Sequence, residues 1–268
     1  MQIPDHIRGE IDSRIASLES KSKVEVLFAI ESGSRAWGFA SSDSDYDVRI
    51  IYMHRPEWYL SVEEEFGDFE NRGAINMPIS DDLDIAGWDL KKTLGLLYKS
   101  NPPLFEWLRS PIIYKRDQKI ADELKQLSEE FYSPKSSVSH YLHMAEGNFR
   151  QYLCNKTEVK RKKYLYVVRP ILACRWIEQH GSFPPMEIDK TLVTISGEPI
   201  RESMVRLIDN KKSGAELGVG PADRELEAFL ASELDRLGKM VGGLPSPKRN
   251  MAELNQYFRE TLASRYLK

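Results

Sequence analysis

Two aspartates, Asp45 and Asp47, stand two residues apart at the start of a short apolar run. Because side chains two residues apart on a β-strand leave the same face, both carboxylates would point the same way. Their Cα atoms would lie about 6.5–7 Å apart, from the rise of a strand. That separation lets two carboxylates converge on a pair of divalent cations about 3.5–4 Å apart. Carboxylate oxygens are hard ligands that suit Mg²⁺, which also takes substrate phosphates as ligands, so a Mg²⁺ site is expected here.

A glycine–serine pair precedes these aspartates by about a dozen residues. Gly33 permits a close approach of the backbone. Ser34 would offer a hydroxyl and an amide at the positive end of a short helix, which suits a phosphate. The charge of Arg35 would lie near the same phosphates. A third carboxylate, Asp84, stands between two apolar residues of another expected strand, where it could complete one metal site and accept a proton from an attacking hydroxyl.

Each motif by itself is weak. A lone Asp-x-Asp at the start of a strand is usually a solvated turn, and Asp43, Asp81 and Asp82 are expected to form turns or to solubilise the chain. The full order is a strand, Gly-Ser, Asp-x-Asp on a strand, and then an aspartate between apolar residues on another strand. This combination is hard to obtain by chance, and it favours a functional site.

Hydrophobic periodicity predicts the elements that would position these residues. Helical spacing covers 3–18, and strands are expected over 24–30, 47–53, 83–88 and 112–114. Asp89 stands where a helix N-cap belongs.

The pattern then changes to helices, expected over 137–155, 158–179, 200–211, 223–241 and 251–267. Pro170 lies inside the second of these and should kink it or mark its start. The predicted fold class is therefore α+β. Residues 1–117 would form a domain with a short mixed sheet, and residues 135–268 would form a C-terminal helical bundle, with the active site expected in the cleft between them.

Composition narrows the class of protein. Apolar residues make up 41% of the 268 residues and charged residues 29%, which is typical of a folded globular protein. The formal charge of −3 does not suggest a protein that coats nucleic acid nonspecifically. No stretch approaches the roughly 20 apolar residues of a membrane span, and the N-terminus lacks a signal core, so the cytoplasm is the expected location. Two cysteines, Cys154 and Cys174, are expected to be structural thiols.

Charge is uneven along the chain. Residues 41–89 hold thirteen acidic side chains against three basic ones, and residues 150–175 hold eight basic against one acidic. Within the basic part, Lys162 and Arg169 are seven residues apart and fall within about 20° of each other on a helix. They are expected to contact a triphosphate or the backbone of an acceptor; the alternative is an exposed, solvated helix face. The role of the acidic segment 57–73 stays open, as does that of Glu31, which could orient the Gly-Ser loop or cap a helix.

The Gly33-Ser34, Asp45-x-Asp47 and Asp84 set resembles the signature of the DNA-polymerase-β-like nucleotidyltransferase superfamily. The wider text is similar to a narrower RlaP-like branch, predicted nucleotidyltransferases grouped with RNA-repair functions; it reads ESGSRAWGFASSDSDYDVR, GWDLKK and KYLYVVRPILACRWIE. The resemblance implies a polymerase-β-like palm and a two-metal mechanism. Asp45 and Asp47 would hold the metals that bridge the triphosphate, Asp84 would bind the metal beside the nucleophile, and Ser34 would grip a terminal phosphate.

The reaction implied is the transfer of a nucleoside monophosphate from an NTP, with ATP favoured, to an acceptor hydroxyl, with release of pyrophosphate. Two Mg²⁺ ions are expected, with Mn²⁺ as the alternative. Three functions stay open. The enzyme could modify an RNA end, as in RNA repair, or it could adenylylate a protein or a small molecule. Alternatively, the chain could be a non-catalytic regulator that binds a partner through the same fold. No membrane partner is expected, and the oligomeric state is left open.

Overall fold

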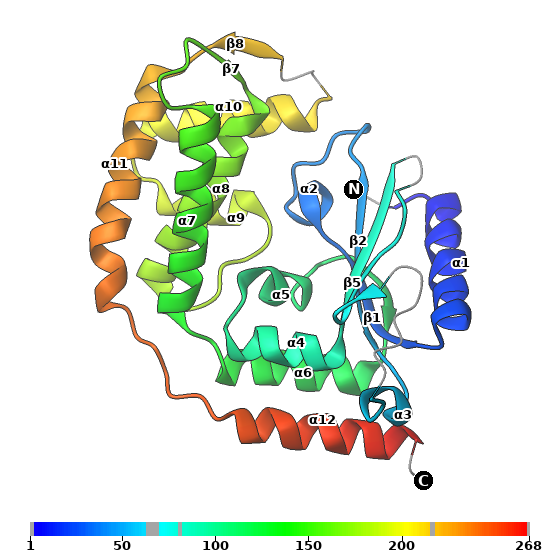
Figure 1. Cartoon of the computed structure of the whole chain (residues 1–268). Helices are drawn as coiled ribbons and strands as arrows, with labels where there is room; N and C mark the ends of the chain where they lie inside the picture. The colour runs from blue at the N-terminus through cyan, green and yellow to red at the C-terminus, as the bar shows by residue number, and fades with distance from the viewer. Residues whose placement is uncertain (1–2, 63–69, 80–81, 215–217, 267–268) are drawn as a thin grey trace. The chain divides into compact units, whose positions relative to one another are not determined.

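The computed structural model describes residues 3–62, 70–79, 82–214 and 218–266. Most of the acidic segment, 63–69, and Asp81 lie outside the described residues. The chain divides into two compact units, which are treated separately below (Figure 1). Unit 1 comprises residues 1–35, 45–131 and 248–268, and unit 2 comprises residues 36–44 and 132–247.

Unit 1 is built on a mixed sheet of six strands in the order β3-β4-β5-β2-β1-β6. The strands are β1 (Glu25–Glu31), β2 (Tyr46–Met53), β3 (Glu70–Asn71), β4 (Ala74–Asn76), β5 (Leu83–Asp89) and β6 (Ile113–Arg116). β1 pairs antiparallel with β2 and with β6, whereas β2 and β5 run parallel. The four strands expected from the sequence are all present, and the short β3 and β4 extend the sheet beyond β5.

Helices cover both faces of this sheet. α1 (Asp5–Ser22) packs on one face, where its periodic apolar residues join a core that includes Val48, Ile50 and Tyr52 of β2. Ile51 and Met53 join the core on the other face, as alternation along a strand requires. The helices that contribute to this second core are α4 (Leu90–Tyr98), α5 (Pro102–Trp107), α6 (Gln118–Glu130) and α12 (Met251–Tyr266). Two four-residue helices, α2 (Gly33–Ala36) and α3 (Pro56–Tyr59), complete the unit. The last residue of α2, Ala36, is the first residue of unit 2.

Two parts of unit 1 differ from the expected organisation. The stretch expected to separate two domains contains the helix α6, capped by Asp117, whose side chain accepts a hydrogen bond from the amide of Ile120. The last helix, α12, groups with the sheet and not with the helical bundle, because Leu254 and Leu262 are buried in the core beside α4. The helical unit therefore ends near residue 247 rather than at residue 268.

Unit 2 is helical and centres on α8 (Lys162–His180), against which α7, α10 and α11 pack. The other elements are α7 (Pro134–Tyr152), α9 (Ile188–Thr191), α10 (Glu198–Lys212), α11 (Arg224–Met240), the 3₁₀ turns η1 (Leu192–Thr194) and η2 (Val241–Gly243), and a two-stranded sheet of β7 (Glu158–Lys160) and β8 (Val219–Pro221). The expectation failed at 158–160, which form a strand and not the start of a helix. Of the two expectations for Pro170, its position inside α8 excludes the start of the helix.

Buried apolar residues of α7, α8, α10 and α11 form one core in unit 2, and Phe39 from the segment 36–44 is part of it. Both cysteines are free thiols, and Cys174 is buried in this core. No helix among the described residues has the length and apolar character needed to cross a membrane.

Candidate active site

Two of the three predicted carboxylates meet on one face of the sheet. In the parallel pairing of β2 with β5, Asp47 and Asp84 are direct partners, so their side chains leave the sheet on the same side. Arg49, two residues after Asp47, bridges them. Its Nη2 donates to Asp47 Oδ1 at 3.0 Å and to Asp84 Oδ2 at 2.8 Å. The sheet register therefore brings together side chains that are 37 residues apart in the sequence.

Gly33 lies directly against the carboxylate of Asp47. A Cβ atom placed on Gly33 would come within 1.8 Å of Asp47 Oδ2, and the φ of Gly33 is +57°. Both the contact and the backbone conformation exclude a side chain here. The glycine of the Gly-Ser motif is thus needed to seat the aspartate of the Asp-x-Asp motif, a relation that the sequence did not reveal.

The third predicted carboxylate, Asp45, is exposed and immediately precedes β2. Its carbonyl oxygen accepts a hydrogen bond from Arg35 Nε at 3.3 Å. Burial raises the pKa of Asp47 above its usual value; Arg49 opposes this, and the charges of Asp84 and Asp45 add to it. The charges of the other two predicted carboxylates therefore act on Asp47, at the start of β2.

Arg35, the next residue after the Gly-Ser motif, packs against the start of β2. It is 9% exposed, and its guanidinium lies 3.8 Å from the centroid of the Tyr46 ring. It ties α2 to the start of β2, a structural role in this conformation. Ser34, beside it, is partly exposed on a helix of only four residues. Because α2 is so short, the hydroxyl and amide of Ser34 are better candidates for a phosphate contact than any helix dipole.

The chemistry of these oxygens fits a hard divalent cation. Among the described residues, however, no group of three or more His, Cys, Asp or Glu side chains is arranged as a complete metal site. Arg49 supplies a single positive charge between the carboxylates of Asp47 and Asp84. These two ion pairs do not include Asp45. The site is thus rich in carboxylate oxygens and only partly neutralised, which suits Mg²⁺ bound together with phosphates.

Glu31, at the end of β1, is fully buried beside Asp47. Its Oε1 accepts the backbone N–H of Asp47 at 3.0 Å, and its Oε2 accepts the hydroxyl of Tyr114 at 2.6 Å. Burial raises the pKa of Glu31 to about 7, although both hydrogen bonds lower it. The sequence suggested two roles for Glu31, and its contacts favour orientation of the site over capping of a helix.

In unit 2, the segment 36–44 is held by a lysine that sequence reasoning missed. Lys211 Nζ of α10 contacts Ser41 Oγ at 2.5 Å and Ser44 Oγ at 3.5 Å. Both serines are buried. The pKa of Asp43 is lowered by its hydrogen bond with Ser41 and by the charges of Lys211 and Lys162. This turn directly precedes Asp45, so Lys211 fixes the chain just ahead of the Asp-x-Asp motif; no spacing in the sequence indicated it.

The two predicted basic residues of α8 lie in unlike settings. Lys162 is exposed in the first turn of the helix, and the Arg169 guanidinium lies 4.0 Å from the centroid of the Trp37 ring. Trp37 belongs to the same unit through the segment 36–44. The structure thus places Arg169 on the segment that follows the Gly-Ser motif, while Lys162 acts electrostatically on Asp43 of the same segment.

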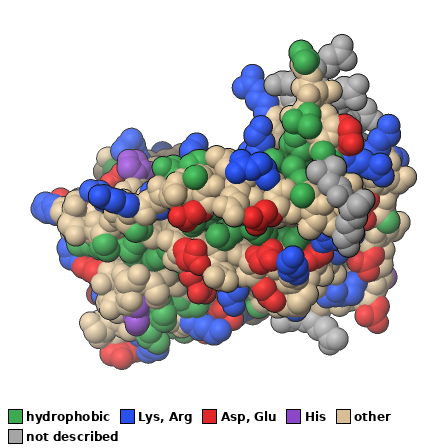
Figure 2. All heavy atoms as spheres, turned by 90° about the horizontal axis from the view of Figure 1, so that it is seen from below, with side chains coloured by type: hydrophobic (Ala, Val, Ile, Leu, Met, Phe, Trp, Pro, Cys, Tyr) green, Lys and Arg blue, Asp and Glu red, His purple; other side chains and the backbone are tan. Residues whose placement is uncertain are grey.

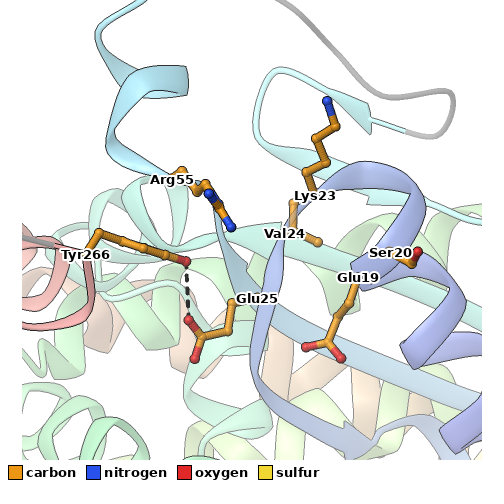
Figure 3. A pocket seen from close by; sticks show the side chains of 7 residues that line it. All are labelled: Glu19, Ser20, Lys23, Val24, Glu25, Arg55 and Tyr266. Atoms are coloured by element: carbon orange, nitrogen blue, oxygen red, sulfur yellow. Dashed lines mark hydrogen bonds between the residues drawn. The ribbon is translucent and has the colours of Figure 1, made fainter.

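A cavity of about 650 Å³ lies at the other end of β1, and it is unrelated to the carboxylates. Figure 3 shows its lining, in which the hydroxyl of Tyr266 donates to Glu25 Oε2 at 3.2 Å. Glu25 begins the strand that Glu31 ends, so Glu25 lies about 20 Å from Glu31 by the rise of a strand. The cavity is not part of the candidate site.

The sequence matches the family model described as "RNA repair pathway DNA polymerase beta family" (RlaP) over residues 7–260. It is 43% identical over 258 residues to the uncharacterized protein YcgL of Bacillus subtilis (strain 168), covering 96% of each chain. A crystal structure of a nucleotidyltransferase-like protein from Exiguobacterium sibiricum 255-15 aligns with 88% of this chain and 75% of its own, at 9% identity and a TM-score of 0.32. At that TM-score, the structural similarity supports no inference about this chain.

Proposed function

This chain belongs to the RNA repair pathway DNA polymerase beta family, and we propose that it transfers a nucleoside monophosphate from an NTP to an acceptor hydroxyl in a Mg²⁺-dependent reaction. The family indicates a polymerase-β-like nucleotidyltransferase. Beyond this enzyme class, we propose the metal, the nucleotide donor and the acceptor. ATP is the favoured donor.

The proposed reaction is an in-line displacement at the α-phosphorus of the NTP. The acceptor oxygen forms a new bond to the α-phosphorus, the bond from that phosphorus to the bridging oxygen of the β-phosphate breaks, and pyrophosphate leaves. The proton of the acceptor hydroxyl passes to Asp84, which lies beside Asp47 on the same face of the sheet. Catalysis of this kind consists mostly of positioning and charge neutralisation.

Each residue of the site has a defined task in this proposal. Asp45 and Asp47 would hold two Mg²⁺ ions, with Asp84 as a further ligand, and Ser34 would contact a terminal phosphate. When bound, Mg²⁺ would neutralise the phosphate charge that these carboxylates otherwise repel. Arg49 keeps the carboxylates of Asp47 and Asp84 close to each other. Lys162 and Arg169 are candidates for contacts to the triphosphate or the acceptor.

One observation carries the proposal. Asp47 and Asp84 are register partners on neighbouring parallel strands, and the glycine of the Gly-Ser motif closes directly on Asp47. Three motifs that are distant in the sequence therefore converge on one side chain. These two carboxylates share the single positive charge of Arg49, so negative charge is left where a cation would bind.

RNA is the acceptor that the family description favours, and the basic segment of unit 2 agrees with it. A protein or small-molecule acceptor is the second candidate, and charge favours it. The formal charge is −3, and on the face that Figure 2 shows, Lys and Arg side chains are interspersed with Asp and Glu side chains. That face does not present the continuous basic surface that a long polynucleotide requires.

Incubation with each α-labelled NTP, together with total RNA and total protein, distinguishes these acceptors. Label in RNA supports the first candidate, and label in protein or in a small product supports the second. The variant Asp84→Asn serves as the blank. If no NTP gives Mg²⁺-dependent label above this blank, the enzyme proposal is wrong and a non-catalytic, partner-binding role takes its place.

A further inference from the structure

The backbone of Asp47 sits where the β1–β2 ladder ends. Glu31 of β1 is paired with Val48, and the next residue, Ser32, donates its N–H to Asp47 O at 2.8 Å. β1 then turns away at Gly33, which has a positive φ. The N–H of Asp47 is bonded to the Glu31 carboxylate at 3.0 Å. A side chain thus supplies the acceptor at a point where the ladder runs out, so the N–H of Asp47 is not left unsatisfied.

The Glu31 carboxylate is itself fixed by a third strand. Tyr114 of β6 donates its hydroxyl to Glu31 Oε2 at 2.6 Å. The backbone of Glu31 is held as well: its N–H donates to Ile112 O at 3.0 Å, and its carbonyl accepts Ser110 Oγ at 2.5 Å. The Glu31 side chain is completely buried, so solvent does not compete for its hydrogen bonds. Both of its oxygens have a directed partner.

We infer that Glu31 is a positioning residue for Asp47, held in place by Tyr114, and that it sets the direction in which the Asp47 carboxylate meets its cation. The inference rests on the proposed role of Asp47 as a metal ligand. Asp47 is then constrained at four points: its N–H by Glu31, its carbonyl by Ser32, its Oδ2 by the bare Cα of Gly33, and its Oδ1 by Arg49. Groups that orient a metal ligand typically change metal affinity or activity by about 10- to 100-fold when removed.

Calorimetric titration of ATP in the presence of Mg²⁺, combined with turnover measured against Mg²⁺ concentration, tests this inference. Glu31→Ala should weaken Mg²⁺-dependent ATP binding or lower kcat by about 10- to 100-fold. Glu31→Gln should stay within a few-fold of wild type, because its amide oxygen can accept the Asp47 N–H and its amide nitrogen can donate to the Tyr114 hydroxyl. Glu25→Ala, at the other end of β1, is the matched control and should leave both readouts unchanged.

Melting curves identify variants that fold. If Glu31→Ala does not fold, Tyr114→Phe replaces it, with an expected loss of about 2- to 10-fold, since it removes one hydrogen bond and leaves the other. Wild-type binding and turnover in the folded variant would overturn the inference. So would equal damage in Glu31→Gln and Glu31→Ala, because charge rather than hydrogen-bond geometry would then matter.

Binding separates this inference from the proposed function. A wild-type protein that binds Mg²⁺ and ATP but transfers nothing refutes the proposed reaction, while the affinities of the Glu31 variants still decide the role of Glu31. A wild-type protein that binds neither refutes both, because Asp47 would then have no ligand to meet.

Discussion

At the scale of single residues, Asp47 is the side chain on which the site converges. Its carboxylate is contacted by Arg49 and lies against Gly33, and its pKa is raised first by burial and then by the neighbouring carboxylates. A partly buried carboxylate of this kind binds a cation more readily than a solvated one, because it has already lost part of its hydration.

Gly33→Ala tests the close approach of the glycine to Asp47. The new Cβ would meet Asp47 Oδ2 at 1.8 Å, and the left-handed backbone alone costs an alanine about 1–2 kcal/mol. Unfolding in urea should show at least this loss, and turnover should fall by about 100-fold because the carboxylate is displaced. Gly147→Ala is the control: nothing lies within 4 Å of its added Cβ, and stability should rise slightly without a change in turnover. Unchanged turnover in Gly33→Ala would contradict the seating of Asp47.

Arg49→Met tests whether Arg49 stands in for part of the cation charge. Without the guanidinium, Asp47 and Asp84 repel each other. In the absence of Mg²⁺, the melting temperature should therefore fall, and the free energy of unfolding should drop by about 1–2 kcal/mol for these partly exposed ion pairs. Added Mg²⁺ should then raise the melting temperature more than it does in wild type. Arg14→Met, which loses an exposed ion pair on α1, should respond to Mg²⁺ as wild type does. Equal Mg²⁺ responses in Arg49→Met and wild type would exclude this role.

The residue types of the site could be predicted, but their contacts could not. Asp45, Asp47 and Asp84 were singled out by spacing and by flanking apolar residues, and the sheet register brings two of them together. The bridging by Arg49, the burial of Glu31 and the seat on Gly33 depend on which strands are neighbours. Trp88, which directly precedes the helix cap Asp89, stacks on Trp107 at 3.7 Å between ring centroids and belongs to the packing of unit 1.

At the scale of elements, ion pairs between α8 and α11 hold the helical unit. Glu233 of α11 is buried and accepts hydrogen bonds from Arg175 of α8 at 2.7 Å and from Arg236 at 2.9 Å. Arg236 also bonds to Glu178 of α8 at 2.6 Å. Arg175 is therefore committed to structure and is not free to contact a phosphate in this conformation.

Stability against acid should report on Glu233. Burial raises its pKa, but the hydrogen bonds from Arg236 and Arg175 outweigh burial, so its pKa lies below the ordinary 4.5. The folded state thus binds its proton less readily than the unfolded state, and the stabilisation is present above pH 4.5 and lost as pH falls through the lower folded-state pKa. In urea unfolding at neutral pH, Glu233→Gln should lose about 3 kcal/mol relative to wild type, and this gap should narrow in acid.

Glu225→Gln, an exposed position on the same helix, provides the control for Glu233→Gln. It should follow wild type at every pH. A gap between Glu233→Gln and wild type that stayed constant into acid would show that the carboxylate charge is not what stabilises α11.

Elements were predictable where the apolar period was unambiguous, and boundaries were not. The strands around Gly33 and Asp47 and the N-cap at Asp89 follow from local pattern, and the Asp89 side chain accepts the N–H of Lys91 at 2.8 Å. α12 belongs to the sheet unit because it packs against α4, about 150 residues earlier in the chain. Hydrophobic periodicity does not indicate such distant contacts. The strand at 158–160 was missed because its partner, β8, lies about 60 residues later.

At the scale of the whole molecule, charge bears on the acceptor. If the acceptor is RNA, binding should weaken with salt, and Lys162→Ala should reduce the slope of log affinity against log salt concentration by about 0.7 for a single strand. Lys239→Ala, an exposed lysine of α11 paired with Asp235, is the control. Retention of RNA that ignores salt, or none at all, would favour a protein or small-molecule acceptor.

The central claim is that Asp47 and its neighbouring carboxylates support nucleotidyl transfer, and parallel reactions with α-labelled and γ-labelled ATP test it most directly. With Mg²⁺, the α-label should enter the acceptor and the γ-label should leave as pyrophosphate. Asp47→Asn should abolish the transfer while melting like a folded protein, and Asp12→Asn, an exposed aspartate of α1, should retain it. Near-full transfer by Asp47→Asn, or entry of the γ-label into the acceptor, would contradict the claim.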